Sequence, residues 1–207
     1  MRPLARRLAL VLAGSSLLAA CHKADGAGGD AMTAPEMGMG NAGAKVTVTE
    51  YASDTCSHCA DFNAKTFPAF KAKYIDSGKV HYVFREFLTA PEQVSAAGFL
   101  LARCVGKDKY FQVVDAIFRA QPEMFASGDA HGVLLRIAQS AGLSEAQFNA
   151  CVQNEDSLKA LASRVQAAQD QQHIEGTPTF LVNGKQLGTS GEKTMAEFDA
   201  AIQPLLK

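Results

Sequence analysis

The stretch SDTCSHCADF, residues 53–62, contains two of the five cysteines of this 207-residue chain. Cys56 and Cys59 are three positions apart, and His58 lies between them. Such a pair can belong to a metal site, form a structural disulfide or exchange electrons with other thiols. Each use requires different residues elsewhere in the chain, so the surrounding sequence can distinguish among the three.

A structural zinc site would need a second pair of cysteines or histidines at short spacing. The remaining histidines of the domain are isolated from one another: His81, His131 and His173. We therefore expect no metal at the Cys56–Cys59 pair.

The first 20 residues have the pattern of an export signal, because three arginines precede apolar runs too short to span a membrane. Leu18–Cys21 resembles the bacterial lipobox, in which the cysteine is acylated after cleavage. A plain signal peptide cleaved near Ala20 is the alternative. We expect Cys21 to be lipidated and to anchor the protein in the bacterial periplasm. His22, which follows it, favours the outer membrane by the enterobacterial sorting rule.

The rest of the chain consists of a tether and one domain. Removing residues 1–20 changes the formal net charge from −1 (20 basic, 21 acidic) to −4 (17 basic, 21 acidic), so no nucleic acid partner is expected. Residues 21–44 are rich in Gly and Ala without apolar periodicity and predict a flexible tether. Its side chains with affinity for copper are His22, Met32, Met37 and Met39. Residues 45–207 have the size of one domain.

The cysteine pair is expected between two strands. Residues 45–53 alternate and are dense in β-branched residues, and residues 79–87 predict a second strand after a Ser-Gly turn. Asp54 and Thr55 can cap the helix that follows the first strand. The pair therefore lies at a strand-to-helix junction inside a βαβ unit.

Residues from about 90 to 173 predict helices only, since their apolar positions recur at helical spacing. Ser144 and Gln147 form a candidate capping box within this region. Residues 177–188 then predict a β-hairpin with an Asn-Gly turn, and a helix from about 194 to 206 ends the chain. The fold class is α/β with an all-helical insertion.

Cys104 and Cys151 each lie on the apolar face of a helix in that insertion. In an exported protein we expect them to form a structural disulfide that closes a loop of 47 residues, although two independent buried thiols are the alternative.

These motifs together resemble the DsbA family of thioredoxin-fold thiol-disulfide oxidoreductases over roughly residues 45–207. The most specific parts are the Cys-Ser-His-Cys motif, Glu50 six residues before it, and Thr177–Pro178 before the hairpin. Ser57 replaces the usual proline of the family. The threonine before the proline stands where oxidases of the family often have valine.

The position of each cysteine predicts its role. A helix N-terminus stabilises a thiolate, so Cys56 is the expected nucleophile, and Cys59 one turn inside is the expected resolving thiol. His58 would further favour the thiolate, or it is simply a solvated loop residue. Glu50 points by strand alternation into the core and would exchange a proton with Cys59, or it is a strand-end acid that reaches water.

Thr177 is the residue that we expect to touch the sulfur pair. Pro178 would begin a strand, and cis geometry there would leave an edge where a substrate chain could add. The sequence alone favours an ordinary trans turn proline.

The resemblance implies an exported enzyme, expected as a monomer, that oxidises cysteines of client proteins through a mixed disulfide at Cys56. It also implies a membrane redox partner of the DsbB or DsbD type and no organic cofactor. A disulfide reductase or isomerase is the alternative enzyme, suggested by Thr177. A copper-handling module that uses Cys56, Cys59 and the methionines of the tether is the alternative from another class.

Overall fold

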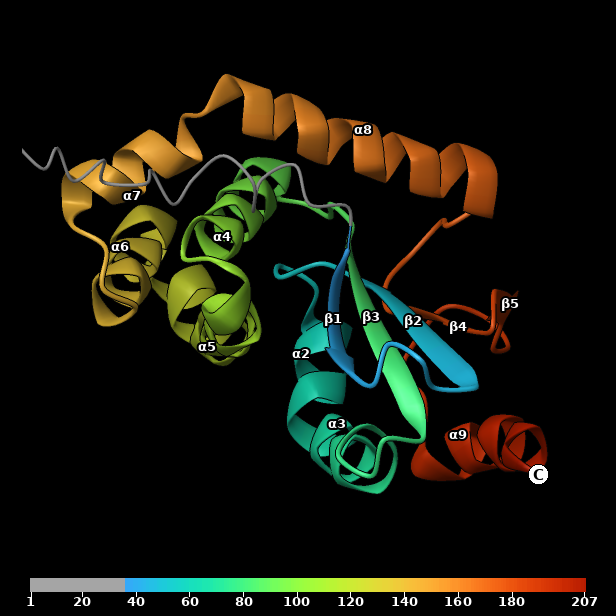
Figure 1. Ribbon diagram of the computed structural model, residues 1–207. Helices are drawn as coiled ribbons and strands as arrows, with labels where there is room; N and C mark the ends of the chain where they lie inside the picture. Colours follow the sequence, from blue (N-terminus) through green and yellow to red (C-terminus); the bar gives the residue numbers. More distant parts are fainter. Residues whose placement is uncertain (1–35) are drawn as a thin grey trace, which may run out of the picture.

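The computed structural model describes residues 36–207 (Figure 1). In chain order its elements are β1 (Met37–Gly40), β2 (Val46–Ala52), α2 (Ser57–Lys65), α3 (Phe67–Phe70), the π-helix η1 (Lys71–Ile75), β3 (Val80–Glu86), α4 (Glu92–Cys104), α5 (Lys107–Ser127), α6 (Ala130–Ser140), α7 (Glu145–Val152), α8 (Glu155–Gln172), β4 (Thr179–Val182), β5 (Lys185–Gln186), α9 (Met195–Ile202) and the 3-10 helix η2 (Gln203–Leu206). This order confirms the predicted α/β fold with a helical insertion. Within the described range, no helix combines the length and the apolar character that a membrane span requires.

The described strands form one mixed sheet in the order β1-β3-β2-β4-β5. β2 and β3 are parallel, while the other neighbouring pairs are antiparallel. Over residues 46–50 of β2, alternate side chains are buried, as the sequence pattern predicts, whereas Tyr51 and Ala52 at the end of the strand are both buried. The register places Glu50 between Phe84 of β3 and Phe180 of β4, in the middle of the sheet.

A cluster of aromatic rings fixes the first helices against the sheet. Phe62 of α2 lies 4.6 Å from Phe180 of β4, measured between ring centroids. Phe70 of α3 lies 4.7 Å from Phe198 of α9, which in turn contacts Phe180 at 5.2 Å. Because these rings are buried, they hold the start of α2 at the end of β2, where the cysteine pair lies.

In the chain, the helices α4–α8 follow β3 and precede β4. They pack beside the sheet, and α8 leads the chain back toward β4 (Figure 1). A buried polar cluster joins them to the end of β3. The carboxylate of Glu86 accepts hydrogen bonds from Arg103 of α4 (3.0 Å), Tyr110 of α5 (3.1 Å) and Arg164 of α8 (2.9 Å). The charge of Glu86 is therefore compensated by three insert helices at once.

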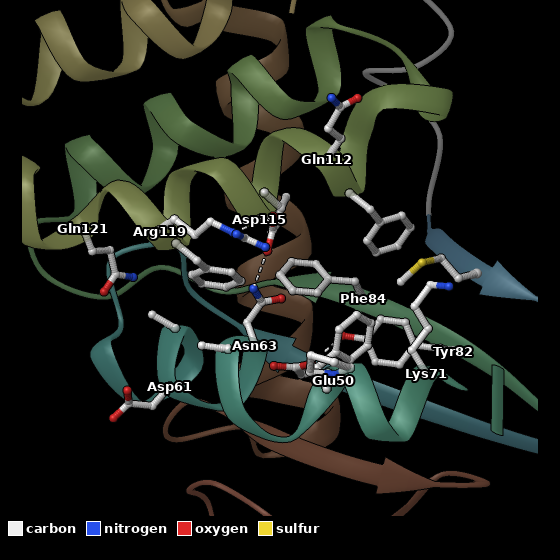
Figure 2. Close-up of a pocket in the computed structure, with 18 of the residues that line it drawn as sticks. Glu50, Asp61, Asn63, Lys71, Tyr82, Phe84, Gln112, Asp115, Arg119 and Gln121 are labelled. Atoms are coloured by element: carbon white, nitrogen blue, oxygen red, sulfur yellow. Dashed lines mark hydrogen bonds and ion pairs between the residues drawn. The ribbon is translucent and has the colours of Figure 1, made fainter. Parts of the chain in front are cut away.

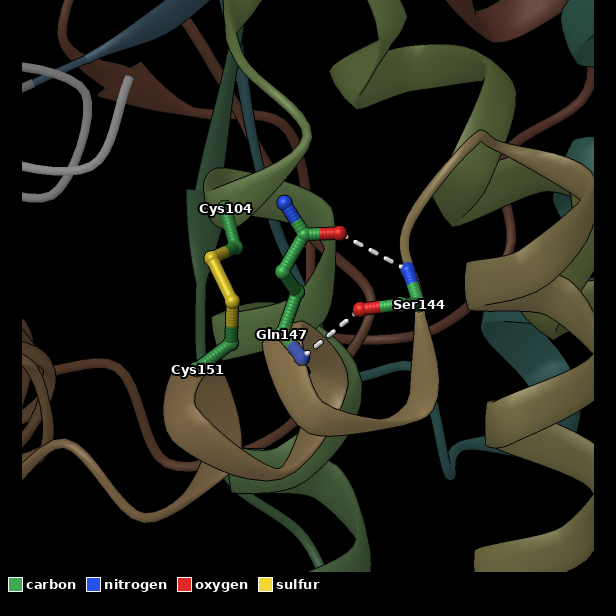
Figure 3. The surroundings of a disulfide bond; sticks show 4 residues. All are labelled: Cys104, Ser144, Gln147 and Cys151. Atoms are coloured by element: carbon green, nitrogen blue, oxygen red, sulfur yellow. Dashed lines mark hydrogen bonds between the residues drawn. A yellow bond between two sulfur atoms is a disulfide. The ribbon is translucent and has the colours of Figure 1, made fainter. Parts of the chain in front are cut away.

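A disulfide between Cys104 and Cys151 connects the end of α4 to α7 (Figure 3). The two cysteines are separated by 47 positions in the sequence, and their Cα atoms are 6.1 Å apart. The expected capping box of Ser144 and Gln147 begins α7 on the same side of the insert. This is the pairing that the sequence predicts, and it closes the loop through α5 and α6.

The strand β1 corrects the expected boundary of the tether, which the composition placed at residue 44. Residues 37–40 pair antiparallel with β3, and the side chain of Met37 is buried. The glycines that suggested flexibility allow close packing, because a Cβ on Gly38 would lie 2.8 Å from the ring of His81. Met37 is thus part of the core rather than a free copper ligand. Cys21, His22 and Met32 lie outside the described residues.

Candidate active site

Cys56 itself occupies the N-cap position of α2, which begins at Ser57. Its sulfur accepts a hydrogen bond from the backbone N–H of Cys59 at 3.3 Å. The sequence suggested Asp54 and Thr55 as caps, but both lie in the buried loop before the helix. A free amide at the helix N-terminus is therefore directed at the sulfur and not at a carboxylate or hydroxyl group.

The two cysteines have opposite electrostatic environments. Hydrogen bonding from Cys59, with smaller contributions from Thr177 and from backbone amides, lowers the pKa of Cys56 to about 6 despite partial burial. The side chain of Cys59 is 0% exposed, and this burial raises its pKa well above the ordinary value. At neutral pH, Cys56 is a thiolate and Cys59 a thiol, and both are free in the structure.

Thr177 and Pro178 face the cysteine pair from the loop before β4. The sulfur of Cys56 lies 3.5 Å from the carbonyl oxygen of Thr177, although the two residues are 121 positions apart in the sequence. The Thr177–Pro178 peptide bond is cis. The fold thus brings together the two segments that the sequence singled out as candidates for the site.

Glu50 lies beneath the cysteines, with its side chain in the core at 2% exposure. The hydroxyl group of Tyr82 on β3 donates a hydrogen bond to its carboxylate. Burial raises the pKa of Glu50 to about 8, and the negative charge of Glu50 in turn raises the pKa of Cys59. Glu50 is therefore a carboxyl group that changes its protonation state near neutral pH and whose charge acts on Cys59.

A cavity of about 720 Å³ borders this carboxyl group (Figure 2). It lies between α2 and α5, and its wall includes the rings of Phe67, Phe111 and Phe118. Asn63 of α2 donates a hydrogen bond to Asp115 of α5 at 2.8 Å across it. The volume is sufficient for several water molecules beside the wall to which Glu50 and Tyr82 contribute.

The loop that carries Cys56 is hydrogen-bonded to helices α4 and α5 of the helical insertion. Gln121 of α5 donates to the carbonyl oxygens of Asp54 (2.7 Å) and Cys56 (3.2 Å). The hydroxyl groups of Ser53 and Ser95 are hydrogen-bonded at 2.9 Å. The Asp54 carboxyl packs against Gly98 of α4, where a Cβ would lie 1.9 Å from one of its oxygens. Burial raises the pKa of Asp54 well above its usual range.

His58 contacts a residue that the sequence did not suggest. Its Nδ1 lies 2.9 Å from the carboxylate of Glu192, and its side chain is largely exposed. The hydrogen bond to Glu192 is the largest cause that raises the pKa of His58. Glu192, Tyr82 and Gln121 are far from the cysteines in the sequence, so no local pattern could identify them.

The site can thus present a reactive thiolate, a buried second thiol and a carboxyl group for proton transfer. Within residues 36–207, no three His, Cys, Asp or Glu side chains are arranged to hold a metal ion.

Comparison with known proteins finds relatives that are named for disulfide chemistry. The family model described as Thioredoxin matches residues 32–204. A protein of Rickettsia conorii named as a protein-disulfide oxidoreductase is 35% identical over 162 residues, which are 78% of this chain and 58% of that protein. Disulfide bond formation protein D of Bacillus subtilis is 26% identical over 175 residues, 82% of this chain and 75% of that protein. This chain therefore spans little more than half the length of the R. conorii relative.

Among solved structures, the crystal structure of Wolbachia pipientis alpha-DsbA1 is similar, with a TM-score of 0.75 and 27% sequence identity. The alignment covers 83% of this chain and 90% of that chain. BdbD from B. subtilis, in its oxidised form, has a TM-score of 0.70 at 22% identity and shares the fold.

Proposed function

This chain belongs to the thioredoxin family, and on that premise we propose that it is a thiol-disulfide oxidoreductase that introduces disulfide bonds into client proteins. The unequal cysteine pair is the observation that carries the proposal. The pKa of Cys56 is lowered to about 6, whereas burial raises that of Cys59. A stabilised thiolate favours the reduced form of the pair, which makes the disulfide form oxidising.

The reaction begins with the disulfide form of the Cys56–Cys59 pair. A client thiolate attacks the sulfur of Cys56, the Cys56–Cys59 bond breaks, and Cys59 leaves as a thiolate. A second client thiolate then attacks the client sulfur of the mixed disulfide and releases Cys56 as a thiolate. Two electrons have passed from the client to the pair, and the client has gained a disulfide.

Glu50 supplies the proton that the departing Cys59 requires, and the cavity beside it exchanges that proton with solvent. The effect of the Glu50 charge on the pKa of Cys59 supports this role, since a carboxyl group with a pKa of about 8 holds a proton at neutral pH. Tyr82 keeps the carboxyl group in place by its hydrogen bond.

The partners follow from this chemistry. Clients are unfolded or newly exported proteins with cysteines, and a client chain lies over Thr177–Pro178, close to Cys56. The reduced pair must return its electrons to an acceptor, for which a membrane protein of the DsbB or DsbD type is the candidate. The chain acts as a monomer and needs no organic cofactor.

The direction of electron flow is tested by the reduction potential of the Cys56–Cys59 pair in glutathione buffers. We expect a potential above about −200 mV, the range of isomerases and oxidases, and net oxidation of a reduced, unfolded client protein. A potential near about −270 mV, as in thioredoxin, together with reduction of client disulfides, would instead identify a reductase.

We further propose that the protein is exported and anchored to a membrane by acylated Cys21, with the outer membrane favoured. The lipobox-like sequence before Cys21 supports this anchor. Cys21→Ser is expected to move the protein from the membrane fraction to the soluble periplasmic fraction or to leave it unprocessed. Soluble wild-type protein that begins at another residue would contradict the anchor.

A further inference from the structure

The contact between His58 and Glu192 connects the cysteine motif to the loop before α9. The two side chains are 134 positions apart in the sequence, and Nδ1 of His58 lies 2.9 Å from an oxygen of Glu192. His58 occupies the first turn of α2, between the two cysteines. Glu192 therefore reaches the active-site motif from a different part of the fold.

The loop that carries Glu192 is built around a buried lysine. The ammonium group of Lys193 donates hydrogen bonds to the backbone carbonyl oxygens of Thr189 (2.8 Å), Gly191 (3.1 Å) and Glu192 (3.4 Å). The side chain of Lys193 is only 6% exposed. A buried charge that is bound to three carbonyl groups holds the loop in one conformation.

The same loop is attached to the segment that faces Cys56. The backbone N–H of Gly191 donates to the carbonyl oxygen of Pro178 at 2.7 Å. The hydroxyl groups of Ser190 and Thr179 are hydrogen-bonded at 2.6 Å. The position of Glu192 relative to the catalytic face is thus set by contacts that do not involve His58.

We propose that Glu192 is a positioning residue of the thiol-disulfide reaction, which holds the imidazole of His58 in its cationic form beside Cys56. The inference rests on the proposed function and deepens it. Glu192 stabilises the imidazolium, and the imidazolium stabilises the Cys56 thiolate. Through these two electrostatic interactions, Glu192 makes the disulfide form of the pair more oxidising.

The negative charges around His58 all raise its pKa. Glu192 from the loop, the thiolate of Cys56 and Asp61 of α2 all favour the imidazolium, with Glu192 the largest contributor. Lys65, which pairs with Asp61 at 3.0 Å, is the cation on the same helix. Because electrostatic coupling is reciprocal, the imidazolium also favours the Cys56 thiolate, by less than the hydrogen bonds that lower the pKa of Cys56.

A double-mutant cycle of Glu192→Gln and His58→Ala tests the proposal on the full mature chain. Glu192→Gln keeps the shape of the side chain and removes its charge. We expect the imidazole of His58 to titrate at lower pH by NMR, and the Cys56 thiolate to titrate at higher pH by ultraviolet absorbance. The equilibrium with glutathione should shift toward the disulfide by about twofold to fivefold, the range of an exposed ion pair.

The His58→Ala background distinguishes an effect of Glu192 that acts through His58 from a direct effect of Glu192 on the Cys56–Cys59 pair. His58→Ala alone should also shift the pair toward the disulfide, and Glu192→Gln should then add no further shift in that direction. Asp61→Asn is the matched control, a nearby carboxylate without contact to His58, and should give a smaller change than Glu192→Gln. An unchanged titration of His58 in Glu192→Gln, or the same shift with and without His58, would overturn the proposal.

Both titrations are independent of any client or redox partner. If they shift as expected while the protein fails to oxidise clients, the proposed function is wrong and the role of Glu192 stands. If client oxidation is found and the titrations do not move, the role of Glu192 is wrong and the function stands.

Discussion

Replacing Cys59 with serine is expected to leave client proteins covalently attached to Cys56. Cys56 is partly exposed at the N-cap of α2, whereas Cys59 is completely buried one turn inside. In the variant the Cys56 thiolate attacks a client disulfide, and one client sulfur leaves as a thiolate. Cys59, whose thiolate would otherwise attack the Cys56 sulfur and release the client, is absent, so the mixed disulfide persists. Adducts should appear as bands of higher mass on non-reducing gels and disappear with reductant.

Two control variants separate the nucleophile from the structural disulfide. Cys56→Ser should give no adducts, because the remaining Cys59 is shielded and has a raised pKa. Combined alanine substitution of Cys104 and Cys151 should lower the free energy of unfolding by about 4 kcal/mol through loop-closure entropy, and adducts should persist in a Cys59→Ser background. Equal trapping by both single variants would show that the two cysteines are not ordered in their roles.

Replacing Glu50 with glutamine is expected to remove much of the pH dependence of stability. Burial raises the pKa of Glu50 from 4.5 to about 8, so the folded protein binds this proton more tightly than the unfolded chain does. The stabilisation from the bound proton is complete below pH 4.5 and is lost as pH rises through about 8. The loss is on the order of 5 kcal/mol.

The measurement compares denaturant unfolding of the two proteins between about pH 4 and about pH 9, a range that includes both the ordinary and the raised pKa of Glu50. Both carry Cys56→Ser and Cys59→Ser, which prevents thiol exchange, and both retain Asp54, whose contribution cancels in the difference. Glutamine keeps an oxygen that can accept the hydrogen bond of Tyr82. Parallel stability curves for the two proteins would show that Glu50 is not the group that changes protonation.

Much of the fold could be predicted because its signals are local. The alternation in residues 45–53 gives β2, and Asn183–Gly184, both with positive φ, form the turn of the predicted hairpin. Ser144 and Gln147 form the capping box that their spacing indicates. The strand β1 was missed because two of its four residues are glycines, and its partner strand lies about 40 positions further along the chain.

The site could be predicted only in part. Cys56, Cys59 and the Thr177–Pro178 segment were identified by motif, and the fold places Cys56 beside Thr177. The residues that hydrogen-bond to Glu50 and His58 could not be found by motif, because Tyr82 and Glu192 reach these two side chains only through tertiary packing. Their residue types are common on strands and loops, so their roles follow from contacts rather than from spacing.

The pairing of β1 with β3 also bears on how the folded protein avoids self-association. With β1 in place, residues 81–84 of β3 are paired with another strand on their outer side. A shortened chain that begins at Lys45, the boundary suggested by composition, would expose a seven-residue strand with mostly buried side chains as an open edge. Such an edge is a template for another strand, so the four residues of β1 protect the sheet from aggregation.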